Sequence, residues 1–156
     1  MGNNPLVSVC IFTYNQEQYV RESLEAAFAQ TYSPLEIVVS DDCSTDRTYE
    51  IIEDLVANYD GPHSVIVNRN VKNLGIGGHV SKVLLDIANG EYFVTVGGDD
   101  VSKPNHIELA YKSICNEPDI MVSDFIASVI DESGSVVVEN YGHPDHLICE
   151  LKRYLQ

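Results

Sequence analysis

Two pairs of adjacent carboxylates stand out in this sequence, and each follows a short apolar run. Asp41-Asp42 comes after the run at 35–39, and Asp99-Asp100 comes after the run at 92–96 and two glycines. Adjacent carboxylates at the end of a buried strand are costly unless they bind a ligand or cap backbone N–H groups. Carboxylate oxygens are also the hard ligands that Mg²⁺ and Mn²⁺ prefer. The pairs therefore indicate an acidic metal-binding site, although a solvated turn explains either pair alone.

The first apolar run, 7–12, is followed by Thr13-Tyr14-Asn15. A dinucleotide-binding fold would place G-x-G-x-x-G at this point, so the sequence argues against NAD or FAD. An aromatic side chain here can stack on a nucleobase or pack on the domain, and the local sequence leaves both open. One carboxylate of Asp41-Asp42 is expected to cap the turn that follows it, which leaves the other free for a base or ribose.

The charge balance narrows the range of partners. The 156-residue chain has a formal net charge of −15, so nucleic acid is a poor partner. An anionic ligand would need a cation to bridge it to so acidic a protein. No segment approaches the roughly 20 apolar residues that a membrane span needs. The 4 cysteines lack C-x-x-C spacing, which favours reduced thiols in a cytoplasmic protein.

Apolar runs of strand length alternate with amphipathic segments. The pattern predicts strands and helices in alternation, with strands at 7–12, 35–39, 64–67 and 92–96 and helices at 17–30, 46–59, 75–87 and 105–116. Ser44 or Thr45 is expected to cap the second helix. A hairpin is expected around 131–134, before a helical tail at 145–156. Residues 1–156 are therefore predicted to form a single α/β domain with an open, mainly parallel sheet and helices on both faces.

Ligands of such sheets bind at the carboxyl ends of the strands. Both acidic pairs follow strand ends, so we expect Asp42 and Asp99 at one edge of the sheet. The histidines give weaker evidence for a binding site. His143 and His146 fit an exposed turn better than a metal site, and His79 fits packing at a helix start better than contact with a diphosphate.

Together these residues resemble the family 2 glycosyltransferases of the GT-A fold. The similarity keeps the order and spacing of the family over 7–15, 30–32, 36–46, 73–77 and 89–100. It implies a Rossmann-like GT-A domain that binds a nucleotide-diphosphate sugar, usually a UDP-sugar. It also implies an inverting transfer of the sugar to a saccharide or lipid-linked acceptor.

The resemblance assigns roles to the residues that bind the nucleoside. Tyr14 would stack on or flank the base, with Phe12 and Thr13 lining the same pocket. Asp42 would accept a hydrogen bond from the base, and Asp41 would support it.

The resemblance also assigns the metal site. Asp99 matches the last acid of the D-x-D motif, which holds Mn²⁺ or Mg²⁺ on the diphosphate, and Asp100 is a further candidate ligand. The chain departs from the family at Gly97, which stands where the first acid usually contacts the ribose. The cation would stabilise charge on the leaving diphosphate.

Inverting transfer also needs a general base that deprotonates the acceptor hydroxyl. The family carries this acid in an acceptor-binding region beyond the D-x-D motif, and no matching segment follows Asp99. We therefore expect the chain to stop before that region and to bind a donor without transferring the sugar. The catalytic base is unassigned. A lipid-linked acceptor would fit a cytoplasmic protein, with peripheral association at the inner face of the membrane.

Two other interpretations stay open. A non-catalytic nucleotide-sugar-binding module would have the same fold and ligand but no base or acceptor site. A phosphoacceptor receiver domain also combines an open α/β sheet with an acidic metal site. That class has its acid pair at the end of the first strand and a Lys after a late strand. Here the first strand ends in Thr13-Tyr14-Asn15, and no Lys follows the fifth strand.

Overall fold

The computed structural model describes residues 4–116, 127–131 and 133–141. Within 4–116, four parallel strands form a sheet in the order β3-β2-β1-β4. The strands are β1 (Val7–Thr13), β2 (Leu35–Asp41), β3 (Ser64–Arg69) and β4 (Tyr92–Gly97). The chain builds β1, β2 and β3 in turn and then crosses back, so that β4 lies on the other side of β1. The predicted open, mainly parallel sheet is confirmed.

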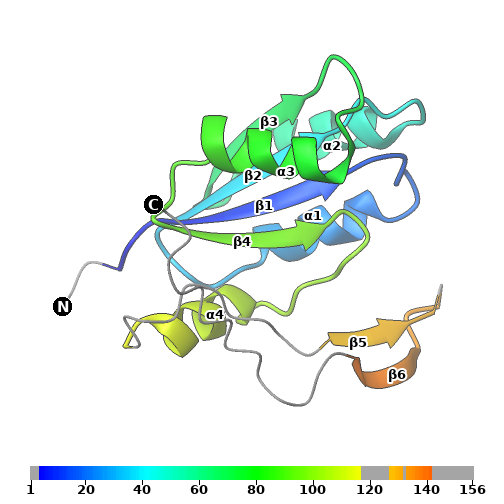
Figure 1. Ribbon diagram of the computed structural model, residues 1–156. Helices are drawn as coiled ribbons and strands as arrows, with labels where there is room; N and C mark the ends of the chain where they lie inside the picture. Colours follow the sequence, from blue (N-terminus) through cyan, green and yellow to red (C-terminus); the bar gives the residue numbers. More distant parts are fainter. Residues whose placement is uncertain (1–3, 117–126, 132, 142–156) are drawn as a thin grey trace. The chain divides into compact units, whose positions relative to one another are not determined.

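The helices pack on both faces of this sheet. Those helices are α1 (Val20–Phe28), α2 (Thr48–Ala57) and α3 (Gly75–Asp86). Helix α4 (His106–Ile114) follows β4 in the chain. Helices α1 and α2 contact each other and share one face, whereas α3 lies in front of the sheet on the other (Figure 1). Because every strand runs the same way, Asp42 after β2 and Asp99 after β4 lie at the same edge, as expected.

The apolar strands form because both of their faces are buried. On β1, Val7, Val9 and Ile11 are almost fully buried, and Cys10 between them packs with Val38 and Val83 of α3. A strand covered on both faces needs a near-continuous apolar run rather than alternation, which is what the sequence predicted for β1 and β2. Burial, with a smaller contribution from Glu36, also raises the pKa of the Cys10 thiol to about 12, so it stays protonated.

The predicted cap of α2 is wrong. The helix begins at Thr48, and it is Asp46 whose carboxylate accepts from the Thr48 backbone N–H at 3.0 Å. Ser44 and Thr45 lie too early in the chain. Their polar groups bind the loop that follows β1 instead, at Asn15.

The contacts divide the chain into two compact units, Met1–Ile107 and Glu108–Gln156. The predicted hairpin is present in the second unit, where β5 (Ala127–Ile130) pairs antiparallel with β6 (Val136–Tyr141). The predicted tail at 145–156 and the histidines at 143 and 146 lie outside the described residues. Among the helices that the structure describes, none is long and apolar enough to cross a membrane.

Candidate functional site

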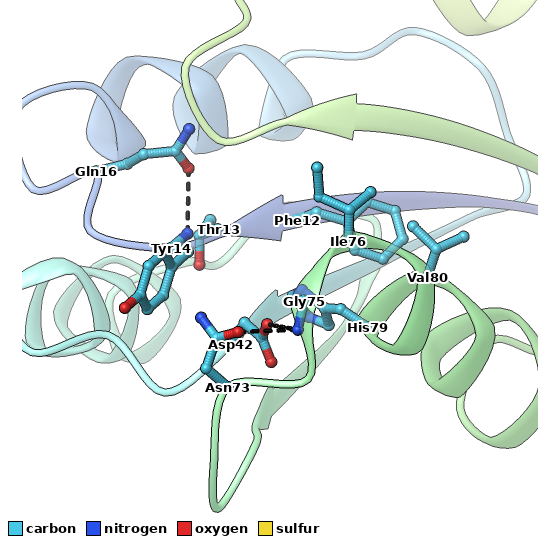
Figure 2. Close-up of a pocket in the computed structure, with 10 residues that line it drawn as sticks. All are labelled: Phe12, Thr13, Tyr14, Gln16, Asp42, Asn73, Gly75, Ile76, His79 and Val80. Carbon is cyan, nitrogen blue, oxygen red and sulfur yellow. Dashed lines mark hydrogen bonds between the residues drawn. The ribbon is translucent and has the colours of Figure 1, made fainter.

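A cavity of about 240 Å³ opens between the end of β1 and the first turns of α3 (Figure 2). It brings together Phe12, Thr13, Tyr14 and Asp42, which are four of the residues predicted to bind the nucleoside. The remaining lining residues are Gln16, Asn73, Gly75, Ile76, His79 and Val80. The lining therefore combines polar side chains with the aromatic ring of Phe12 and the aliphatic side chains of Ile76 and Val80.

Asp42 is only 3% exposed and is held by N–H groups from a distant part of the chain. Its carboxylate accepts from Asn70 Nδ2 at 2.8 Å and from the backbone N–H groups of Leu74 and Gly75 at 2.9 and 3.0 Å. Burial opposes ionisation, yet these hydrogen bonds lower the pKa of the Asp42 carboxyl below its ordinary value. The Leu74 N–H is shared between both oxygens, at 2.9 and 3.0 Å, so each oxygen of the carboxylate accepts two hydrogen bonds.

Asp41 does not line the cavity and is fully buried. It accepts from the Ser44 backbone N–H at 2.9 Å and from the Ser44 hydroxyl, and it lies 3.5 Å from Arg69 Nε. The expectation that one carboxylate caps the turn is therefore correct for Asp41. The other carboxylate, Asp42, has protein partners of its own, because it accepts from N–H groups at the start of α3.

Tyr14 is 47% exposed and stands at the mouth of the cavity. Its loop is tied to the loop after β2 by hydrogen bonds in both directions. Asn15 N donates to Ser44 Oγ at 2.9 Å, Thr45 N donates to Asn15 Oδ1 at 2.9 Å, and Gln16 N donates to Thr48 Oγ1 at 2.7 Å. These bonds fix the backbone that carries Tyr14 relative to Asp42.

Asp99 and Asp100 are exposed at the end of β4 and do not line the cavity. Asp100 folds back, so that its Oδ2 accepts from Gly97 N at 3.1 Å. A Cβ on Gly97 would lie 2.8 Å from Asp99 Oδ1 and 2.9 Å from Asp100 Oδ2. Both carboxylates thus crowd the space where the first acid of the D-x-D motif would begin.

The donor chemistry at this position fits a hard cation. One or two carboxylates suit Mg²⁺ or Mn²⁺, which keep other positions for water and for the phosphates of a ligand. Within the described part of the chain, no group of three His, Cys, Asp or Glu side chains could hold a metal without such a ligand. Asp99 and Asp100 are therefore the residues that would hold it.

Gln30 anchors the loop that carries these acids, and the sequence interpretation gave it no role. Gln30 Nε2 donates to Lys103 O at 2.8 Å, and its Oε1 accepts from Ile107 N at 3.2 Å. Thr31 N adds a bond to Pro104 O at 2.9 Å. The sequence did contain one signal for a role of Gln30, because the family resemblance included residues 30–32.

His79 is 4% exposed and lies between Phe12 and the end of β2. Its ring meets Phe12 edge-on, with 5.1 Å between the ring centroids, and its Nε2 lies 2.7 Å from Ser40 Oγ. The predicted packing role is confirmed. The same side chain also lines the cavity.

Comparison with known proteins gives a family for this arrangement. The model of the family described as "Glycosyl transferase family 2" matches residues 8–148. An uncharacterized glycosyltransferase of Haemophilus influenzae is 40% identical over 69% of this chain and 32% of its own length. Another, from Methanocaldococcus jannaschii, is 31% identical over 97% of this chain and 51% of its own. The chain spans about half or less of these relatives.

Solved structures share the fold. TarS of S. aureus, residues 1–349 in complex with UDP-GlcNAc, has a TM-score of 0.60 and 26% identity, covering 80% of this chain and 40% of that one. The mannosyltransferase PcManGT of Pyrobaculum calidifontis, in complex with GDP-Man and Mn²⁺, has a TM-score of 0.69 and 24% identity over 83% and 36%. Because PcManGT is only 24% identical to this chain, its similarity is evidence for the fold alone. The predicted GT-A fold is confirmed.

Proposed function

The chain belongs to glycosyltransferase family 2, and from this premise we propose that its cavity binds the nucleoside of a nucleotide-diphosphate sugar, a UDP-sugar. The family assignment replaces the receiver-domain interpretation. The proposal extends to transfer of the sugar, with inversion, to a saccharide or lipid-linked acceptor. A lipid-linked acceptor would bring the cytoplasmic protein to the inner face of the membrane.

The observation that carries the proposal is the placement of Tyr14 and Asp42 around one cavity. A half-exposed aromatic ring offers a face on which a base can stack. An ionised carboxylate offers an acceptor for a base N–H. Uracil has such an N–H at N3, and the apolar walls at Ile76 and Val80 suit its ring.

Asp99, with Asp100 beside it, is proposed to hold Mn²⁺ or Mg²⁺ near the diphosphate. The cation would supply the positive charge that stabilises a leaving diphosphate. The protein's own contribution is to hold the carboxylates. Gly98 N donates to Phe12 O at 2.9 Å, which fixes the acidic turn next to the end of β1.

The experiment separates donor binding from transfer. The chain is incubated with UDP-sugars, Mn²⁺ and a mixture of acceptors, while UDP release and glycoside formation are followed independently. We expect saturable UDP binding and slow donor hydrolysis, because no general base for the acceptor is assigned in these residues. Acceptor-dependent turnover would show that the base lies within the chain and would direct attention to Asp100, Asp124 and Asp131. A chain that binds neither UDP nor a UDP-sugar would contradict the proposal.

A further inference from the structure

A continuous chain of hydrogen-bonded polar side chains connects Asp42 to His79, two residues that line the cavity. Asn70 Nδ2 lies 2.8 Å from Asp42 Oδ1, and Asn68 Nδ2 lies 3.1 Å from Asn70 Oδ1. The same Asn68 nitrogen lies 2.8 Å from Ser40 Oγ, which in turn lies 2.7 Å from His79 Nε2. Ser40 pairs with Phe12 on one neighbouring strand and with Asn68 on the other, so the chain follows the strand ends toward α3.

The charge on Asp42 fixes the direction of each bond in this chain. An ionised carboxylate only accepts, so Asn70 must present its NH₂ group to Asp42. The carbonyl oxygen of Asn70 therefore faces Asn68 and accepts from the NH₂ of that residue. The second hydrogen of the same NH₂ is donated to Ser40 Oγ.

The Ser40 hydroxyl then determines which His79 nitrogen carries the proton. Ser40 is fully buried, and among the described residues His79 Nε2 is the acceptor within reach of its O–H. Burial lowers the pKa of His79, against the attraction of Asp42 and Asp41, so the ring is neutral near pH 7. A neutral imidazole that accepts at Nε2 carries its hydrogen on Nδ1.

The Nδ1–H group is available to a ligand. No residue within 4–116 is hydrogen-bonded to this nitrogen, and it is not fully buried. The cavity is the opening that His79 lines. The ring is also close enough to Asp42 for each to shift the pKa of the other.

We propose that His79 donates a hydrogen bond from Nδ1 to the bound base, beside the base N–H that Asp42 accepts. The site thereby reads a base edge that presents a donor next to an acceptor. In uracil these are N3–H and a neighbouring carbonyl oxygen. The inference rests on the proposed function, because it concerns the same nucleoside site, and it makes His79 a specificity-determining residue.

Two substitutions of His79 test the roles of its two ring nitrogens separately. His79→Gln places an amide near the position of Nε2, where it keeps the contact with Ser40 but has no donor toward the cavity. His79→Asn places its NH₂ near the position of Nδ1 and gives up Ser40. We expect His79→Gln to weaken uridine binding about three- to tenfold, the loss of one neutral hydrogen bond. His79→Asn should retain more of the affinity.

Nitrogen-15 NMR of the histidine rings supplies a readout that a purely structural role would not move. In the ligand-free wild type we expect a hydrogen on His79 Nδ1 and none on Nε2. Saturation with uridine should shift the Nδ1 proton and slow its exchange with water. A hydrogen on Nε2, no response of Nδ1 to bound uridine, or equal affinities of both variants would overturn the assignment of His79. Failure of the wild type to bind uridine or UDP would overturn the proposed function, and this inference with it.

Discussion

The carboxylate of Asp42 accepts a hydrogen bond from the backbone N–H of Gly75 at 3.0 Å, which joins the end of β2 to the first turn of α3. Gly75 has φ of 68°, a conformation that L side chains rarely adopt, so this turn depends on glycine. The acid proposed to contact the base therefore also fixes the helix that forms a wall of the cavity. Substitution at position 42 should affect both stability and binding.

Asp42→Ala is expected to lower the free energy of unfolding by about 2 to 3 kcal/mol, because buried N–H groups lose a charged acceptor. It should also weaken binding of uridine itself by about 10- to 100-fold. Denaturant unfolding and calorimetry measure the two effects. Asp60→Ala, at an exposed acid, is the matched control and should change neither. Unaltered uridine affinity in folded Asp42→Ala would remove Asp42 from the base site.

The stability of the chain should depend on the titration of His79. Burial lowers the pKa of His79 in the folded state, so below about pH 6.5 the unfolded chain binds a proton more readily than the folded one. This contribution to stability is present above that pH and is lost as the pH falls toward the folded pKa. His79→Gln should reduce the slope of unfolding free energy against pH in this range. Part of the slope should remain, because burial lowers the pKa of His106 as well. An unchanged slope would contradict the assigned burial effect.

Asp99→Asn should separate metal-assisted binding from nucleoside binding. In the wild type, Mn²⁺ should strengthen UDP binding by about tenfold or more, which corresponds to about 1.4 kcal/mol. The variant should lose this dependence and bind uridine like the wild type, since Asp99 does not line the cavity. Calorimetry with and without Mn²⁺ checks both statements. Equal losses for uridine and UDP would argue against a metal role.

Gln30→Ala should act on the metal site from a distance. Its amide holds the loop after β4 at Lys103 and Ile107, so its loss should cost about 1 to 3 kcal/mol of unfolding free energy. UDP binding with Mn²⁺ should weaken more than uridine binding, because the loop carries Asp99. Gln18→Ala, at an exposed position, is the control. A proportional loss for both ligands would mean that Gln30 supports only the fold.

Local patterns predicted the sheet but only half of the site. The apolar runs predicted β1 and β2 because those strands are buried on both faces, and the turn cap at Asp41 followed from a residue three positions away. The partners of Asp42 lie about thirty positions later in the sequence, at Asn70 and Gly75. Patterns among neighbouring residues therefore could not predict them. The misassigned cap at Ser44 has the same cause, since its hydroxyl is bound by the distant Asn15.

The most direct test of the nucleoside site is a uridine titration of the nitrogen-15-labelled chain, followed through the backbone amide signals. The account predicts saturable shifts concentrated in the two segments that flank the cavity, 13–16 and 73–80, with Tyr14 and Gly75 among the largest. The absence of saturable shifts at millimolar uridine, or shifts concentrated away from these segments, would contradict the assignment of this cavity to the nucleoside.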